Sequence, residues 1–290
     1  MSREERLTAI YDTLECLERG YLTRHNEKIM LDPRDMTTSV EGTVKLTKAK
    51  ISAKVKEVRP GEKEGAVVVV NGDTFEVALL LKKAGYNPVV LNMASGTRPG
   101  GGYMNGAGAQ EESLFRRSNL AYCLDNDYVN QNFYPLGPSE VIYTPQVIVF
   151  KDTEAKKYAP LSPRNVGVIT CPAYKCREGE KWRRPLKELT KTKMDLILQT
   201  GIVYGHDAIV LGALGCGAYR NPPAEIASLF HETITGYRKY YRYIVFAIID
   251  DRNGFTNDRR GNVAIFSAGL GTEAVSPAHL DTMLTSTLKD

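Results

Sequence analysis

The sequence predicts a layered α/β fold with a mixed central sheet between helices. Apolar, β-branched runs recur along the chain, and most are separated by segments of helical length. Continuous apolar runs bounded by glycine, proline or asparagine are typical of strands that are covered on both faces. Because strands that alternate with helices favour parallel pairing, we expect most of the sheet to be parallel.

Five apolar runs are expected to form strands. They begin at Ala66 (AVVVV), Pro88 (PVVLNMAS), Asn165 (NVGVITCP), Ala208 (AIVLGALG) and Tyr241 (YRYIVFAIID). The stretch EVIYTPQVIVFKD, residues 140–152, differs because Pro145 separates two short strand-like runs. Proline is poorly tolerated in a central strand, so we expect an edge hairpin or a bent edge strand here. The predicted sheet is therefore mixed.

Four segments between the strands have the length of helices: residues 73–85, 111–124, 193–205 and 222–240. The chain also begins with a charged, amphipathic helical pattern. We expect an N-terminal helical extension over residues 1–60, followed by the main domain over residues 61–290. The glycine, proline and charged residues of RPGEKEG mark the expected junction.

The composition indicates a folded protein inside the cell. Of the 290 residues, 42% are hydrophobic and 25% are charged, as in an ordinary globular protein. No stretch approaches the roughly 20 apolar residues of a membrane span, and the charged start does not resemble a signal peptide. Five scattered cysteines favour a reducing compartment over a disulfide framework. We expect a cytoplasmic protein, or a nuclear one in a eukaryote, with no membrane association.

The charge of the chain argues against a basic nucleic-acid tail, and the spacing of its cysteines argues against a zinc site. The formal charge of +4 is mild, and no lysine or arginine run resembles a nucleic-acid tail. Locally basic segments fit either solvated surface or a face for a polyanion. Cys171 and Cys176 are the only neighbouring cysteines, and their spacing is not a usual zinc pattern. We expect neither a metal nor a cofactor.

Three loops are expected to meet beyond the carboxyl ends of the strands, where open α/β sheets bind ligands: residues 71–74, 95–112 and 212–223. The last of them, GALGCGAYRNPP, holds three glycines in six residues and then opens a helix at Pro222. Backbone N–H groups and a helix N-terminus can bind a diphosphate, but the same pattern also fits a tight structural turn.

The loop at residues 95–112 carries the stronger signal. Gly100, Gly101 and Gly102 allow positive φ and a close approach of substrate to the main chain. Glu111 and Glu112 follow at the first turn of a helix, where acidic residues also favour the dipole for structural reasons alone. A carboxylic acid beside a bound sugar can protonate a glycosidic oxygen. Because a helix N-terminus favours the ionised form, we expect one glutamate to be shielded from water.

The stretch LNMASGTRPGGGYMNGAGAQEESLFRRSNLAYCL resembles the signature of the bacterial-type (microbial) poly(ADP-ribose) glycohydrolases, a branch of the macrodomain fold. That signature is GGG, a short spacer and QEE, and here a seven-residue spacer separates residues 100–102 from residues 110–112. Further likeness follows in the family's order over roughly residues 66–255: VVVVNGDTFEVALLL, VIYTPQVIVFKD, LGALGCGAYRNPP and YIVFAIIDDR. The resemblance implies a macrodomain-like three-layer fold with an N-terminal helical extension.

The resemblance also implies roles for the residues of the signature. Glu112 would be the catalytic acid at the ribose–ribose bond. Glu111 would hydrogen-bond the ribose hydroxyls at that bond and help to orient the leaving sugar. Gly100, Gly101 and Gly102 would lie along the diphosphate and the distal ribose. Gln110 would brace the loop.

The second loop and two separate residues receive roles in the same way. The second phosphate loop would consist of Gly215, Cys216, Gly217 and Ala218. Tyr219 stands where the family often has a phenylalanine that presses on the distal ribose. Asn92 would point at the distal ribose or make a structural hydrogen bond, and Asp73 would accept from the adenine amino group or cap a helix. A nucleophilic Cys216 is disfavoured because no partnered histidine lies within sequence reach.

The resemblance implies a metal-independent hydrolase that releases ADP-ribose, mainly from the free end of poly(ADP-ribose). Its partners would be poly(ADP-ribose) or ADP-ribosylated macromolecules, and we expect a monomer. Two alternatives remain open: a hydrolase of single ADP-ribose units on protein or nucleic acid, and a non-enzymatic macrodomain that only binds ADP-ribose. The adjacent glutamates argue against the second alternative.

Overall fold

The structure is a computed structural model that describes residues 1–177, 179–250 and 260–287. The chain forms two compact units: unit 1 contains residues 1–45, 92–137 and 142–171, and unit 2 contains residues 46–91, 138–141 and 172–290. The first 45 residues therefore cluster with parts of the main domain, while the proposed domain boundary at residue 60 stays a prediction. Among the described helices, none is long and apolar enough to span a membrane.

Unit 1 combines helices with antiparallel strands: α1 (Arg3–Arg19), β1 (Tyr21–Arg24), β2 (Glu27–Met30), α2 (Pro33–Glu41), η1 (Tyr103–Asn105), α5 (Gln110–Arg117), α6 (Leu120–Leu124), α7 (Asp127–Asn132), β6 (Glu140–Lys151), η2 (Glu154–Lys156) and β7 (Pro160–Cys171). The predicted N-terminal helix is confirmed. Ser2 and Glu5 form a reciprocal capping box at its start, and Gly20 ends it with a φ of 74°.

The helix expected over residues 111–124 is two helices, so that expectation was wrong. Ser118, between α5 and α6, has an extended backbone. Its neighbour Asn119 is tied to β6, because the backbone N–H of Ile148 donates to Asn119 Oδ1 and the N–H of Asn119 donates to the carbonyl of Ile148. Pairing with a strand distant in sequence interrupts the helix.

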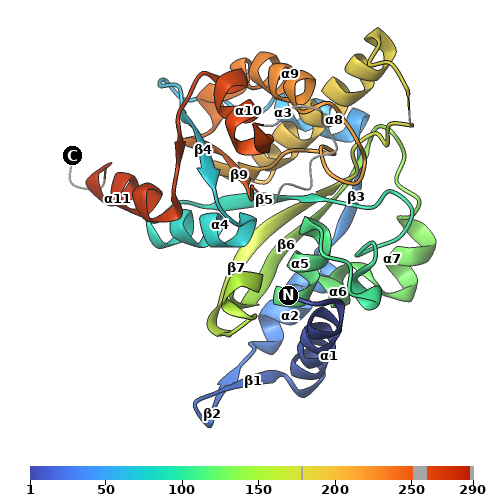
Figure 1. The fold of residues 1–290 in the computed structure, drawn as a ribbon, viewed down its shortest axis with the longest axis vertical. Coiled ribbons are helices and arrows are strands. Elements are labelled where there is room, and N and C mark those ends of the chain that lie inside the picture. Colours follow the sequence, from blue (N-terminus) through green and yellow to red (C-terminus); the bar gives the residue numbers. More distant parts are fainter. Residues whose placement is uncertain (178, 251–259, 288–290) are drawn as a thin grey trace. The chain divides into compact units, whose positions relative to one another are not determined.

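Strand β6 shows how the chain accommodates Pro145. The segment is one 12-residue strand that pairs antiparallel with β7, as Figure 1 shows. The register shifts between Thr144 and Val147, and Gln146 within this bulge has a φ of 53°. A bulge leaves the proline nitrogen out of the hydrogen-bond ladder. The bend was predicted correctly, but the position at the sheet edge was not, because β3 (Val44–Thr47) lies beyond β6.

Unit 2 contains the parallel strands and most of the longer helices: α3 (Lys48–Val55), β4 (Ala66–Asn71), α4 (Thr74–Lys83), β5 (Pro88–Met93), α8 (Arg184–Val203), β8 (Ala208–Leu211), α9 (Pro223–Thr235), η3 (Arg238–Tyr240), β9 (Tyr243–Ile248), α10 (Gly261–Leu270), β10 (Ala274–Val275) and α11 (Pro277–Thr287). Its strands pair in parallel. Every residue of β8 and β9 is buried, as expected for strands covered on both faces.

The main sheet has eight strands in the order β10-β4-β9-β8-β5-β7-β6-β3. Parallel pairs and the antiparallel β6–β7 pair occur in the same sheet, and helices flank it. The predicted α/β class with a mixed sheet is confirmed. The run from Asn165, however, belongs to the antiparallel strand β7.

Candidate active site

The triple glycine of unit 1 lies directly against the paired glutamates. Gly101 has a φ of +55°, and a Cβ built on it would lie 2.7 Å from Glu112 Oε1 and 3.1 Å from Glu111 Oε2. Gly100 has a φ of +68°, and its Cβ would lie 2.5 Å from the Tyr103 ring and 2.7 Å from the Phe115 ring. The protein's own side chains therefore already require glycine at both positions.

Glu111 is held by three N–H donors. The backbone N–H of Ser95 donates to Oε2 at 2.7 Å, and that of Gly100 donates to Oε1 at 3.1 Å. Asn92 Nδ2 also donates to Oε1, at 3.4 Å. The side chain is 3% exposed, so these contacts replace hydration of the carboxyl group. Glu111 is fixed between the end of β5 and the glycine loop.

Burial raises the pKa of Glu111 to about 8 from its ordinary value of 4.5. The nearby charge of Glu112 adds to the rise, while the three N–H donors oppose it. At neutral pH this carboxyl therefore holds its proton. The proton belongs on Oε2, because Oε1 already accepts two hydrogen bonds and Oε2 accepts one.

Glu112 is buried as well, but one of its oxygens is uncommitted. Oε1 accepts from the backbone N–H of Gly102 at 2.9 Å. Oε2 has no hydrogen-bond partner in the structure. It is also shielded from water, because the residue is only 7% exposed. The expectation of a shielded glutamate is therefore confirmed for both members of the pair. Glu112 is the member of the pair with an oxygen that makes no hydrogen bond.

Asn92 and Gln110 connect the end of β5 to the first turn of α5. Asn92 donates to Glu111 and, at 3.2 Å, to Thr170 Oγ1, while its own Oδ1 is buried without a partner. Gln110 Oε1 accepts from the backbone N–H of Met93 at 2.9 Å. The structural hydrogen bond left open for Asn92 is present, and Gln110 braces the strand end. Contact of Asn92 with a ribose stays a prediction.

Sequence reasoning missed three residues of this site. Ser95 acts through its main chain, which leaves no side-chain signal in the sequence. Thr170 lies on the antiparallel strand β7, distant in sequence from Asn92. Tyr134 has a buried hydroxyl without a partner, and burial, together with the charges of Glu111 and Asp125, raises its pKa.

The second glycine loop belongs to unit 2. Gly215 has a φ of +75°, and a Cβ there would overlap Asn221 Nδ2, which donates to the carbonyl of Tyr174 at 2.7 Å. A Cβ on Gly217, by contrast, would meet no atom within 4 Å. Part of this loop is thus a tight structural turn, and part of it has an open side.

Three other predicted residues of this loop have different environments. Burial raises the pKa of the Cys216 thiol, so the group stays protonated and is a poor nucleophile. Ala218 is exposed. The Tyr219 ring centroid lies 5.9 Å from Lys175 Nζ, and the Tyr219 carbonyl accepts from the N–H of Cys176.

Asp73 caps helix α4, because its Oδ1 accepts from the backbone N–H of Glu76 at 3.0 Å. Of the two roles left open for this residue, helix capping is therefore observed, and contact with adenine stays a prediction. Across residues 1–177, 179–250 and 260–287, no group of three or more His, Cys, Asp or Glu side chains is placed to hold a metal ion.

Comparison with known proteins finds similarity to one family. Residues 11–152 match the family described as microbial-type PARG, catalytic domain. The crystal structure of poly(ADP-ribose) glycohydrolase (PARG) from Thermomonospora curvata is 27% identical, with a TM-score of 0.79 over 92% of this chain and 99% of that chain. Its complex with the inhibitor ADP-HPD is also 27% identical and gives a TM-score of 0.76 over 91% of this chain and 99% of that one.

A PARG from Deinococcus radiodurans, crystallised in complex with ADP-ribose, is 26% identical and has a TM-score of 0.69 over 81% of this chain and 97% of that chain. A search of curated proteins finds no match. The structural likenesses confirm the predicted macrodomain-like fold. Together with the match over residues 11–152, the GGG and QEE motifs and the buried glutamate pair, they support microbial-type PARG as the family that this chain resembles.

Proposed function

We propose that the protein is a poly(ADP-ribose) glycohydrolase that cleaves the ribose–ribose O-glycosidic bond, mainly at the free end of the polymer, and releases ADP-ribose. One observation carries the proposal: Glu112 has a buried oxygen without a partner, beside a glycine loop and a second buried carboxyl group. A pure binding protein has no need for such a carboxyl pair, because desolvating it costs free energy. The related structures are poly(ADP-ribose) glycohydrolases, and one of them is in complex with ADP-ribose.

In the proposed reaction, Glu112 donates a proton to the glycosidic oxygen as the bond between this oxygen and the anomeric carbon breaks. The sugar then carries positive charge, which the substrate's diphosphate stabilises. A water oxygen attacks the anomeric carbon and gives a proton to the Glu112 carboxylate, which restores the acid.

Glu111 acts differently in this proposal. Its oxygens are occupied by three N–H donors, so its free hydrogen-bonding capacity is the proton that it carries at neutral pH. That proton can be donated to a ribose oxygen, while Asn92 and Ser95 hold the carboxyl group in place. Glu111 thus orients the sugar without delivering the catalytic proton.

The remaining roles concern the other parts of ADP-ribose. Gly100, Gly101 and Gly102 lie along the diphosphate and the distal ribose in the proposed complex. The loop of unit 2 supplies N–H groups to the second phosphate, and the open side of Gly217 supports this role. Tyr219 presses on the distal ribose, and Asp73 accepts from the adenine amino group in addition to capping α4.

Release of ADP-ribose from purified poly(ADP-ribose) tests the proposal. We expect release by the wild type and a loss of roughly 10²- to 10⁴-fold in Glu112→Gln, which keeps the shape of the side chain but removes the acid. Glu225→Gln is the matched control, because Glu225 is also in the first turn of a helix but forms an ion pair with Lys187. ADP-ribose binding should survive in both variants.

The same preparations should be tested on protein that carries single ADP-ribose units. Release from this substrate but not from the polymer would contradict the proposed substrate and favour the mono-ADP-ribosyl hydrolase. Tight ADP-ribose binding without release from either substrate would contradict hydrolysis and favour a binding protein.

A further inference from the structure

Helix α1 contacts the segment that leads from the glycine loop into α5. The Arg3 guanidinium Nε donates to the carbonyl of Asn105 at 2.9 Å. A Cβ on Gly106 would lie 2.7 Å from the Arg3 carbonyl, and a Cβ on Gly108 would overlap the Arg6 guanidinium. These glycines therefore allow α1 to pack directly on the main chain just before Glu111 and Glu112.

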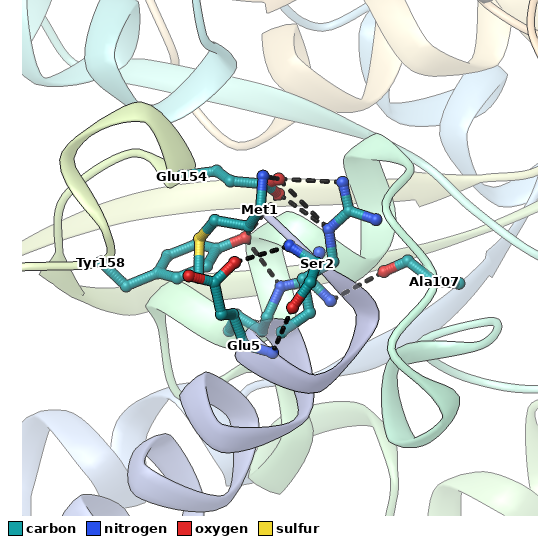
Figure 2. Close-up of polar contacts among 8 residues, drawn as sticks. Met1, Ser2, Glu5, Ala107, Glu154 and Tyr158 are labelled. Atoms are coloured by element: carbon teal, nitrogen blue, oxygen red, sulfur yellow. Dashed lines mark hydrogen bonds and ion pairs between the residues drawn. The ribbon is translucent and has the colours of Figure 1, made fainter.

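Four side chains continue this contact as a hydrogen-bonded network, which we call the arginine network: Arg6, Glu154, Tyr158 and Arg116. Arg6 Nη2 donates to Glu154 Oε1 at 2.8 Å, and the Tyr158 hydroxyl donates to Glu154 Oε2 at 3.0 Å. Arg116 Nε donates to the Tyr158 hydroxyl at 2.8 Å. Figure 2 shows Tyr158 beside Glu154, with Ala107 on the other side of the network.

Arg116 joins the network to the loop. Its Nη1 donates to the carbonyl of Ala107 at 2.8 Å, and the side chain is fully buried on α5. Arg116 lies one helical turn after Glu112, so both side chains lie on the same side of the helix. Arg6 is also close enough for the charge of Glu112 to contribute to its raised pKa, although the hydrogen bond to Glu154 is the main cause.

The start of α5 needs this support because it lacks an ordinary cap. The N-cap residue is Ala109, which has no side chain able to accept from the first N–H groups. Arg116 fixes Ala107 two residues earlier, and Arg6 covers Gly108. At the last turn of α5, Thr13 Oγ1 of α1 donates to the Arg116 carbonyl at 2.6 Å. Helix α1 therefore holds α5 through both its start and its last turn.

We infer that Arg6 and Arg116, joined through Glu154 and Tyr158, are positioning residues that fix the start of α5 and thereby the orientation of Glu112. The inference rests on the proposed glycohydrolase function. It gives the N-terminal helix a part in catalysis. Helix α1 contributes no reacting group, but it fixes the position of Glu112. A misplacement of about 1 Å can cost on the order of 100-fold in rate.

The smallest test removes one hydroxyl group. Tyr158→Phe breaks both hydrogen bonds of the bridge, and Tyr237→Phe is the matched control, because Tyr237 also donates to a carboxylate (Asp195) and accepts from a side-chain nitrogen (Gln199). We expect kcat for ADP-ribose release to fall roughly ten- to 100-fold in Tyr158→Phe. KM, ADP-ribose affinity and the loss in Tm should match those of the control.

A second readout does not depend on turnover. Amide hydrogen exchange over residues 100–113 should accelerate in Tyr158→Phe and stay unchanged in Tyr237→Phe. If the wild type hydrolyses no polymer, the proposed function fails, and this exchange measurement still decides whether the network holds the loop. Unchanged exchange together with an unchanged kcat would overturn the inference.

The charge of Arg6 provides a graded comparison. Arg6→Lys keeps the cation near Glu154 but loses the two-nitrogen contact, whereas Arg6→Ala loses both. We expect kcat to fall in the order wild type, Lys variant, Ala variant, with ADP-ribose affinity unchanged. Equal kcat values for the wild type and Arg6→Ala would also overturn the inference.

Discussion

The two glycine-rich loops have similar composition but different surroundings. In unit 1, Gly101 faces the oxygens of Glu111 and Glu112, so the space that a side chain would need is filled by carboxyl groups. In unit 2, the corresponding space at Gly217 is open, and Gly215 is fixed by the amide of Asn221. The glycines of the first loop are therefore closely packed, whereas the second loop combines a closely packed Gly215 with an open Gly217. In the proposed function, the first loop lies beside the acid and along the diphosphate, and the second loop binds the other phosphate.

Substitution of single glycines should reveal the difference between the two loops with the largest effect. Gly101→Ala places a Cβ against both glutamates at a φ of +55°. We expect kcat to fall on the order of 100-fold or more, with a stability loss above about 1 kcal/mol. Gly217→Ala should keep the wild-type Tm and change mainly the affinity for ADP-ribose. Kinetics, calorimetric binding and thermal unfolding of both variants check this prediction, and equal effects would contradict the contrast.

The protonation of Glu111 sharpens the comparison through pH. Because the pKa of Glu111 is about 8 in the folded protein and near 4.5 when unperturbed, the folded state binds the extra proton between these values. Its contribution to stability therefore falls as pH rises from about 4.5 to 8. Each pKa unit of difference corresponds to about 1.4 kcal/mol.

Glu111→Gln removes this proton equilibrium. We expect the stability of the wild type, relative to this variant, to decrease by a few kcal/mol from pH 5 to pH 9. Denaturant unfolding at a series of pH values measures the slope, which does not depend on the variant's baseline stability. Parallel pH profiles for the two proteins would show that Glu111 is ionised throughout.

Cys216 should give the smallest effect. Its thiol lies in the glycine loop of unit 2, but burial raises its pKa and keeps it uncharged. We expect Cys216→Ala to retain kcat within about twofold, because a thiol without a thiolate form contributes no nucleophile. Loss of activity without loss of Tm in this variant would contradict the assignment.

Much of the fold and the glutamate pair could be predicted from local sequence. The buried strands β4, β8 and β9 are continuous apolar runs, and the GGG motif precedes the QEE motif at the start of α5 by seven residues. The break between α5 and α6 could not be predicted in this way, because Asn119 leaves the helix to pair with Ile148. That pairing exists only once distant segments have met.

The same limit applies to the chemistry of the site. The sequence indicates a shielded carboxyl, but not that Glu111 holds the proton, since this depends on burial and on the three N–H donors of Asn92, Ser95 and Gly100. Tyr158 and Glu154 follow β6, and no local pattern links them to Arg116 on α5. Contacts of this kind, between segments distant in sequence, form only in the folded chain.

The most direct measurement compares kcat for ADP-ribose release from poly(ADP-ribose) between the wild type and Glu112→Gln, with ADP-ribose affinity determined on the same preparations. We expect the variant to bind ADP-ribose as the wild type does and to lose roughly 10²- to 10⁴-fold in kcat. A Glu112→Gln variant that turns over the polymer at the wild-type rate would contradict the central claim that this buried carboxyl delivers the proton.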